Sequence, residues 1–175
     1  HHQDDNAETF FLHLARGSGL RGLGGIYPVN GMYIRPLLCV GRKEIEDYLK
    51  GREMPYCIDT TNMEDAYMRN RIRNHVIPYF KENINEKTVE HMNRSMDQLR
   101  EIWDYMERQT ESAYQICTDQ NGEKICIHAD AYHRQERLIR KMILRKALAL
   151  VAEHEKDLEQ VHVEKLEGLF EKQVG

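Results

Sequence analysis

The sequence has no long apolar run. Its 175 residues contain nothing close to the roughly 18 to 20 consecutive apolar residues of a membrane-spanning helix. The first residues are polar and acidic, unlike those of a secretory signal peptide. We therefore expect no membrane partner and a cytoplasmic location.

Cysteine is also sparse, and the cysteines do not form pairs along the chain. The four residues Cys39, Cys57, Cys117 and Cys126 include no CxxC motif, and their spacings match no common zinc site. A framework of disulfides is unusual for a core of this size. We expect four reduced cysteines, which is typical of a cytoplasmic protein, and no metal site built on them.

An excess of positive charge is lacking as well. There are 25 Lys+Arg residues against 29 Asp+Glu residues, a formal net charge of −4, which argues against a general nucleic-acid binder. A local basic surface stays compatible with this total, because the distribution of charge matters more than its sum. With 41% hydrophobic residues, the chain has the composition of one globular domain or of two small ones.

The chain opens with HHQDDNAETFFLHLARGSGLRGLGG, which predicts a helix over residues 4–16. Asp4 or Asp5 is the expected cap at its start, and Gly17 is placed to end it in a left-handed conformation. The face expected to be buried consists of apolar residues at helical spacing, namely Ala7, Phe10, Phe11 and Leu14.

Further elements are expected to be mainly helical. They are an edge strand or extended segment at 32–40, helices at 41–54, 67–80 and 86–113, a hairpin at 114–129, and closing helices at 134–153 and 161–174. Asn121-Gly122 is the turn signal of the hairpin. The expected buried residues are Ile45, Tyr48 and Leu49 in the helix at 41–54, and Leu138, Ile139, Met142, Ile143, Ala149 and Leu150 in the first closing helix.

The long helix at 86–113 carries a heptad pattern. Its apolar residues alternate spacings of three and four: Val89, Met92, Met96, Leu99, Trp103 and Met106. Packing against a neighbouring helix of the same chain is the favoured interpretation, because the pattern is short for a free coiled coil. The alternative is a seam between two copies, which would make the chain a homodimer or a non-catalytic helical interaction module.

A basic stripe is expected on the first closing helix. Arg134, Arg137 and Lys141 follow one another at helical spacing. The stripe could contact phosphate groups of a nucleic acid. A solvated face balanced by acidic residues of the final helices is the other interpretation.

The acidic opening allows several interpretations. Two leading histidines resemble a purification tag, but the residues that follow are not linker-like, so we take them as native. His1, His2, Asp4 and Asp5 are suitable metal ligands and would fit a metal-dependent phosphohydrolase. Adjacent residues of one helix point about 100° apart, however, so they rarely reach one ion together. Asp5 and Glu8 share one face, although acidic residues in a first turn are also favourable through the helix dipole.

Three segments in this order change the weight of these interpretations, with the metal-dependent phosphohydrolase kept as the alternative. HHQDDNAETFFLHLARGSGLRGL, IRPLL and YCIDTTNMEDAYMRNRIRNHVIPYF together resemble the tRNA(Ile)-lysidine synthetases, members of the PP-loop ATP pyrophosphatase group. Within these segments, five separated blocks agree with the family's motifs HHxDDxxET, RGSGLxGL, IRPL, D(S/T)(S/T)N and RNxIR, and together they cover roughly the first 80 residues. The rest of the chain resembles the family's helical domain more loosely. The family's ATP-binding loop, SGGxDS, is not in this sequence. The resemblance therefore implies a fragment without the N-terminal ATP loop and the C-terminal domain, inactive by itself.

The resemblance implies a fold and a reaction. The fold is mainly α with a partial α/β portion: residues 1–82 form the C-terminal part of a Rossmann-like PP-loop domain, and residues 83–175 form a helical tRNA-binding domain with a small β-hairpin. The family attaches free L-lysine to the wobble cytidine of isoleucine tRNA. ATP, with Mg²⁺, first adenylates the cytidine and releases pyrophosphate, and the lysine ε-amine then displaces AMP.

This chemistry has physical requirements of its own. A pocket for an ammonium group needs carboxylates, and the ammonium must lose a proton before it attacks, because only the neutral amine is a nucleophile. A carboxylate can orient the amine and help to accept the proton. A guanidinium is needed to neutralise phosphate charge as it develops.

The family motifs then suggest which residues meet these requirements. The resemblance implies Asp5, Glu8 and Arg73 as the catalytic residues, with no metal ligands. The weaker candidates for substrate or tRNA binding are Arg69, Asn70, Arg71 and Arg16. Asp59, Thr61 and Asn62 are expected to shape the turn before the RNRIR segment.

Overall fold

The computed structural model describes residues 1–57, 68–122, 124–152 and 160–172. It divides into two compact units, His1–Trp103 and Asp104–Gly175. The predicted domain boundary at 82/83 stays a prediction. Asp59, Thr61 and Asn62 lie outside the described residues. None of the helices in the described ranges combines the length and apolar character that a bilayer crossing requires.

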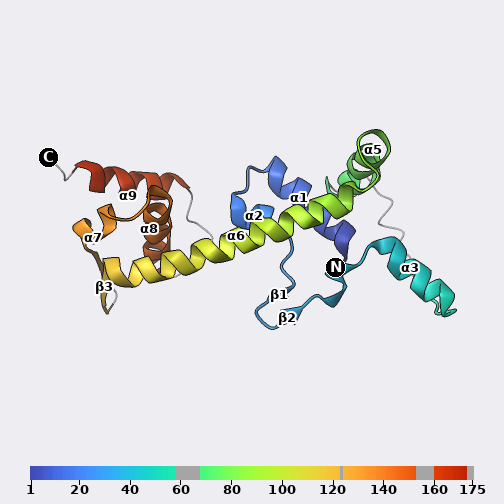
Figure 1. The fold of residues 1–175 in the computed structure, drawn as a ribbon, viewed down its shortest axis with the longest axis horizontal. Coiled ribbons are helices and arrows are strands. Elements are labelled where there is room, and N and C mark those ends of the chain that lie inside the picture. The colour runs from blue at the N-terminus through green and yellow to red at the C-terminus, as the bar shows by residue number, and fades with distance from the viewer. Residues whose placement is uncertain (58–67, 123, 153–159, 173–175) are drawn as a thin grey trace. The chain divides into compact units, whose positions relative to one another are not determined.

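The described residues are mainly helical, as expected (Figure 1). The first unit contains α1 (Gln3–Ala15), α2 (Leu20–Leu23), β1 (Val29–Asn30), β2 (Tyr33–Ile34), the 3-10 helix η1 (Pro36–Cys39), α3 (Arg42–Gly51), α4 (Met68–Arg71), the π-helical turn η3 (Ile72–Val76) and α5 (Ile77–Asn83). The helix α6 (Thr88–Cys117) begins in the first unit and ends in the second. The second unit adds β3 (Thr118–Asn121), β4 (Lys124–Ile127), α7 (Ala129–His133), α8 (Arg137–Val151) and α9 (Gln160–Lys172).

The start of α1 differs from the prediction. His2, not Asp4 or Asp5, is the N-cap, and its Nδ1 accepts the backbone N–H of Asp5 at 3.4 Å. The carboxylate of Asp5 in turn accepts the N–H of His2 at 3.0 Å, which completes a capping box. Gly17 has φ +71°, which confirms the left-handed residue expected after the helix.

The core of the first unit is formed by α1, η3, α5 and α6. Its buried residues are Ala7, Ile72, Ile77 and Val89, with Phe11, Leu12, Val76 and Met92 packed against them. Ala7 and Phe11 were expected in this core. The prediction for Leu14 was wrong: it is 51% exposed, and Leu12 packs against the core instead.

A polar network fixes α1 and the glycine-rich segment to α6. Asn6 donates to Asn93 Oδ1 at 2.8 Å and accepts the N–H of Ile26 at 2.6 Å. Gly25 has φ +70°, and a Cβ there would lie 2.4 Å from Asn6 Oδ1. Glycine is therefore required where this loop passes over α1.

Two predictions at 32–54 need correction. The segment 32–40 pairs only at Tyr33–Ile34 and then forms η1, because Pro36 starts a helical turn well and cannot donate to a strand. The helix α3 confirms the expected element but buries no residue, and Tyr48 is 59% exposed. An amphipathic pattern therefore predicted the helix correctly but not its burial.

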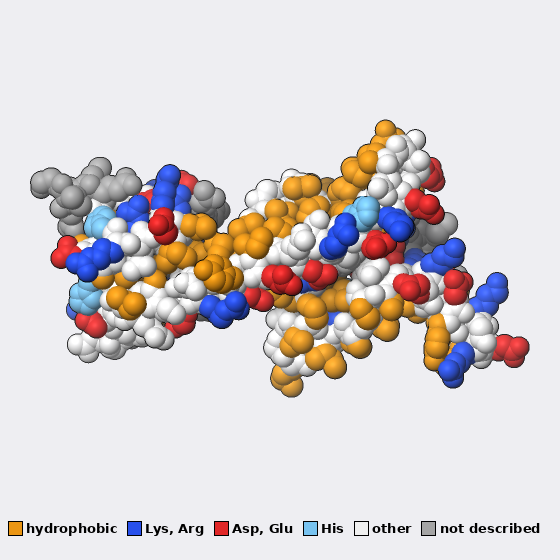
Figure 2. All heavy atoms as spheres, in the orientation of Figure 1, with side chains coloured by type: hydrophobic (Ala, Val, Ile, Leu, Met, Phe, Trp, Pro, Cys, Tyr) orange, Lys and Arg blue, Asp and Glu red, His pale blue; other side chains and the backbone are white. Residues whose placement is uncertain are grey.

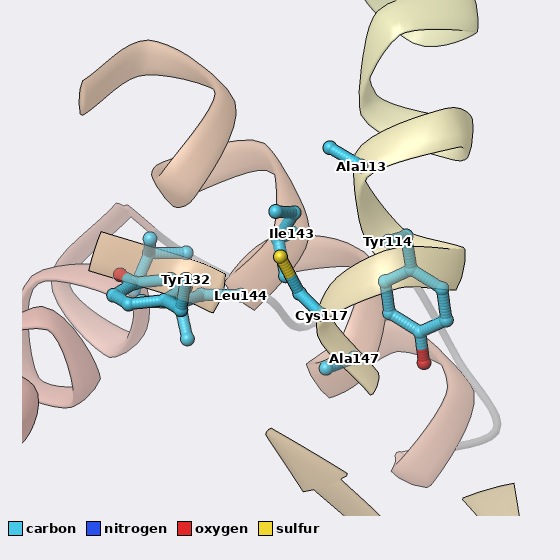
Figure 3. Packing of buried hydrophobic residues seen from close by; sticks show 8 residues of the cluster. Ala113, Tyr114, Cys117, Tyr132, Ile143, Leu144 and Ala147 are labelled. Atoms are coloured by element: carbon cyan, nitrogen blue, oxygen red, sulfur yellow. The ribbon is translucent and has the colours of Figure 1, made fainter. Parts of the chain in front are cut away.

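The second unit has its own core, shown in Figure 3. Ala113, Tyr114 and Cys117 of α6 pack with Tyr132 of α7 and with Ile143, Leu144 and Ala147 of α8. Leu138 and Leu150 were expected here but are 52% and 49% exposed, so the buried stripe of α8 is narrower than its apolar pattern.

The hairpin is confirmed around Gly122, which has φ +63°, with Asn121 paired to Lys124. Its first strand begins only at Thr118, because α6 continues to Cys117. On α6, Val89, Met96 and Met106 are buried within the chain, as the favoured interpretation of the heptad pattern expected. A homodimer stays a prediction.

Two residues of the predicted basic stripe, Arg137 and Lys141 on α8, face one acidic residue of α9. Arg137 Nε and Lys141 Nζ each lie 3.6 Å from the carboxylate of Glu167 on α9. This pairing favours the interpretation of a face balanced by the final helix.

Candidate active site

Two carboxylates one helical turn apart project from α1 toward the RNRIR segment. The side chain of Glu8 is 1% exposed and that of Asp5 is 17% exposed. Their spacing of three residues places them on one face of the helix. The pair is therefore shielded from solvent to different degrees.

Two arginines converge on the buried Glu8. Arg69 Nε donates to Oε2 at 2.7 Å, and Arg73 Nε donates to Oε1 at 2.5 Å. An Nη of Arg73 also donates to Oε2 at 3.0 Å, so Arg73 makes a bidentate pair. Both oxygens of Glu8 are thus occupied by guanidinium groups.

Asp5 makes longer contacts with the same arginines. Its Oδ1 lies 3.5 Å from an Nη of Arg69 and 3.5 Å from an Nη of Arg73. Its Oδ2 accepts the N–H of His2. Oδ1 of Asp5 is therefore held less tightly than either oxygen of Glu8.

Opposite charges in the cluster stabilise one another. The hydrogen bond to Glu8 is the main reason why the pKa of Arg73 is raised above its ordinary value, and the charges of Glu8, Asp5 and Asp4 add to it against the opposing effect of burial. Arg73 is therefore firmly a cation, suited to hold or neutralise an anion and unsuited to act as a base.

The π-helical turn η3 sets the direction of this segment. In an α-helix, residues five apart point about 140° away from each other, at 3.6 residues per turn. Here Ile72 and Ile77 are five apart, yet both are buried in the core of the first unit. Pro78 gives a reason for the wider turn, because proline has no N–H to donate and its ring crowds the carbonyl four residues earlier.

A third carboxylate, Asp4, lies one turn before Glu8 and joins α1 to two other elements. Its Oδ2 accepts the backbone N–H of Arg42 at 2.8 Å, and its Oδ1 lies 3.6 Å from Nζ of Lys81. Hydrogen bonding to His2, the N–H of Arg42 and the charge of Lys81 hold the pKa of Asp4 well below its ordinary value, although burial opposes them. Asp4 therefore stays ionised.

A pocket of about 210 Å³ opens beside the cluster. We call it the α1–α5 pocket. It is lined by His2, Asp4, Glu8, Arg42, Arg73, Ile77, Pro78, Lys81 and Glu82. Figure 2 shows acidic and basic side chains interspersed on the visible face of this part of the molecule. The pocket thus offers both signs of charge beside an apolar wall.

The segment that holds the cluster matches a known family of domains. The PP-loop domain family matches residues 1–80, the part that holds the whole cluster. Residues 1–80 are therefore similar to a PP-loop domain. The tRNA(Ile)-lysidine synthase of Caldanaerobacter subterraneus subsp. tengcongensis is 42% identical over 172 residues, which is 98% of this chain and 37% of that protein.

Further relatives carry the same name. The tRNA(Ile)-lysidine synthase of Clostridium perfringens is 34% identical over 177 residues, 100% of this chain and 37% of that protein. The enzyme of Geobacter sulfurreducens is 37% identical over 154 residues, 86% of this chain and 32% of that protein. The chain therefore matches about a third of the length of these relatives.

The structure brings together four of the seven predicted site residues: Asp5, Glu8, Arg69 and Arg73. Asn70 is buried and Arg71 is exposed on the neighbouring turn. Arg16 is exposed beyond the far end of α1, about 16 Å along the helix from Asp5. The roles assigned to all seven stay predictions.

The sequence did not point to Arg42 or Lys81 as site residues. Asp4 was considered only as a helix cap and as a metal ligand, and Arg42 lies just outside the IRPLL segment. One signal was available: Arg73, Ile77 and Lys81 recur every four residues, which predicts a common face.

The proposed metal ligands His1, His2, Asp4 and Asp5 do not assemble. Within the described ranges, no group of three or more His, Cys, Asp or Glu side chains is arranged to hold a metal ion. His2 and both aspartates instead take part in the cap and contacts of α1. The structure thus gives no support to the metal-dependent phosphohydrolase.

Proposed function

We propose that this chain supplies the amine-binding part of the active site of a tRNA-modifying ligase. The ligase attaches the ε-amine of free lysine to the wobble cytidine of isoleucine tRNA after ATP has adenylated that cytidine, with release of pyrophosphate and then AMP. In this proposal residues 1–82 are the C-terminal part of a Rossmann-like domain, and residues 83–175 are a helical domain that contacts tRNA.

The observation that supports this proposal is the cluster on α1. Two carboxylates and two guanidiniums meet at hydrogen-bonding distance in the segment that matches the PP-loop family. A ligase of this kind must bind a cationic amine and an anionic phosphate side by side, and the cluster carries groups of both signs.

The carboxylates divide the work in this proposal. Asp5 receives the ammonium group, because its Oδ1 has only contacts of 3.5 Å to give up. Its carboxylate orients the amine and helps to remove the proton, since only the neutral amine attacks. Glu8 remains hydrogen-bonded to Arg69 and Arg73 and orients their guanidinium groups, so that Arg73 faces the phosphate of the adenylated cytidine.

ATP acts in the proposed reaction together with Mg²⁺. In the cluster, both carboxylates contact arginines. ATP is a substrate of the proposed reaction, and the guanidinium groups are the only groups of the cluster that suit its phosphates.

The test uses the full-length protein that carries this chain. Labelled lysine should become attached to isoleucine tRNA in an ATP-dependent reaction that releases AMP, and the same tRNA with uridine at the wobble position should remain unlabelled. Arg73→Lys should lower kcat about 100-fold or more, as expected for a lost bidentate donor at developing charge. Arg94→Lys, at an exposed position on α6, is the matched control. Folded full-length protein that leaves isoleucine tRNA unlabelled in the presence of ATP and lysine contradicts the proposal.

A further inference from the structure

Two charged pairs cross the α1–α5 pocket one helical turn apart. The first joins Asp4 to Lys81, and the second joins Glu8 to Arg73. On α1 the two carboxylates are separated by four residues, which is about 6 Å along the helix. Ile77 lies midway between the two cations in the sequence and lines the same pocket. The pocket therefore has charge at two levels and an apolar wall between them.

The balance of charge in this pocket limits its ligand. Asp4, Glu8 and Glu82 oppose Arg42, Arg73 and Lys81, so the lining has no excess of either sign. Because these groups already pair with one another, a ligand of one sign that displaced a pairing would leave the other member of the pair without a counter-charge. A ligand that carries both signs would satisfy them.

The size of the pocket limits the ligand further. Its volume of about 210 Å³ is below the ~300–1,000 Å³ of pockets for drug-sized molecules. The same volume of liquid water holds roughly seven molecules. A free amino acid is of comparable size. Ile77 and Pro78 supply the apolar wall that a chain of methylene groups requires.

We propose that the α1–α5 pocket binds the α-amino and α-carboxylate end of the free amino acid. Lys81 and Arg42 hold the α-carboxylate, Asp4 holds the α-ammonium group, and the methylene chain passes Ile77 toward Asp5, which receives the ε-amine. This assignment rests on the proposed function and makes Lys81 and Arg42 determinants of specificity for an amino acid over a simple diamine.

The contacts that Lys81 and Arg42 make in this structure allow them to bind a carboxylate. Lys81 lies 3.6 Å from Asp4, which is longer than a charge-assisted hydrogen bond. Arg42 is already oriented by its backbone bond to Asp4 and by the bond from its Nε to Glu46 at 2.7 Å. Its backbone stands at the start of α3, where the helix dipole also favours an anion.

The test compares lysine with cadaverine, which is lysine without its α-carboxylate, in the full-length enzyme. Lys81→Gln should raise KM for lysine roughly tenfold or more, the loss of a charged hydrogen bond. The Ki of cadaverine as a competitor should stay within twofold. Lys81→Arg should restore most of the affinity for lysine. Lys50→Gln, at an exposed position outside the pocket, is the control. Arg42→Gln provides a second, independent variant, and thermal unfolding checks that each variant is folded.

The outcomes separate the two proposals. Suppose that the wild-type enzyme labels its tRNA, but that Lys81→Gln and Arg42→Gln weaken the binding of lysine and of cadaverine equally, or weaken the binding of neither. The pocket assignment is then overturned and the proposed function stands. If folded wild-type enzyme shows no lysine-dependent labelling, the proposed function fails and the assignment fails with it.

Discussion

At the scale of single residues, the two carboxylates of the cluster differ in their burial and in how closely they contact the two arginines. Glu8 is almost fully buried and carries the bonds of two guanidiniums. Asp5 is more exposed and contributes only long contacts to them. Since a buried charge that loses its partner is costly, these two acids should respond very differently to neutralisation.

Glu8→Gln should lower the free energy of unfolding by about 2–3 kcal/mol, because it leaves two partly buried arginines with only the longer contacts to Asp5. Asp5→Asn should change it by less than about 1 kcal/mol. Urea unfolding of both variants measures the difference. Equal losses would mean that the burial of Glu8 has no energetic consequence.

Asp4 should make the stability depend on pH in the acidic range. Its pKa in the folded protein lies below the ordinary value of 3.8, so the unfolded chain binds its proton first as the pH falls. The ionised group therefore stabilises the fold above about pH 4, and this contribution is lost as the pH falls further. Thermal unfolding of Asp4→Asn between pH 6 and pH 2.5 should show a flatter decline than the wild type.

Asp47→Asn, at an exposed position of α3, serves as the control for this titration. Its decline with pH should follow that of the wild type. A decline for Asp4→Asn as steep as that of the wild type would show that Asp4 gains nothing from Arg42 and Lys81.

At the scale of elements, the π-helical turn decides where the arginines point. In an α-helix, residues four apart share a face, but Ile72 and Ile77 are five apart. The wider turn accommodates the extra residue, so that both isoleucines reach the core while Arg69 and Arg73 reach Glu8. Single-turn π-helices are frequent at functional sites, where they change the direction of side chains. The proposed role of Arg73 thus depends on a local irregularity of the helix.

Deletion of His75, which is exposed within η3, should convert the turn to a regular α-helix. Ile72 and Ile77 would then be four apart and still share a face, so the loss of stability should stay below about 2 kcal/mol. Deletion of the exposed Gln98 from α6 is the matched control. It turns the rest of the helix by about 100° and should cost considerably more. Thermal unfolding that shows equal losses would contradict the account of η3.

At the scale of the whole molecule, the chain has two hydrophobic cores. Ala7, Ile72, Ile77 and Val89 form one, and the cluster around Tyr132, Ile143 and Leu144 forms the other. No residue belongs to both clusters, as far as the described residues extend. The two units should therefore lose stability separately.

Ile143→Ala should destabilise the second unit by about 3 kcal/mol, because Ile143 is fully buried. Hydrogen exchange should become faster in α8 and α9 and stay unchanged in α1 and α5. Leu150→Ala, at a position 49% exposed, should have an effect below about 1 kcal/mol. Faster exchange in α1 to the same extent would mean that both units unfold together.

The sequence predicted the helices well where periodicity and terminal signals agreed. Gly17 and Asn121-Gly122 have conformational preferences that are local, so their turns could be recognised without the fold. Burial was harder to predict. Tyr48 and Leu138 lie on apolar faces, yet both are exposed, because burial depends on whether a neighbouring element covers the face.

The sequence by itself determined the helical character of the chain and the motif residues Asp5, Glu8 and Arg73, because spacing along a helix and the identity of motif residues are properties of the chain alone. Only the tertiary structure decided that both arginines bind Glu8, and that Asp4 and Lys81 complete a pocket beside it. Those partners are more than 60 residues apart in the sequence. Their distances follow from how α1 packs against η3 and α5, a property of the folded core that no local pattern contains.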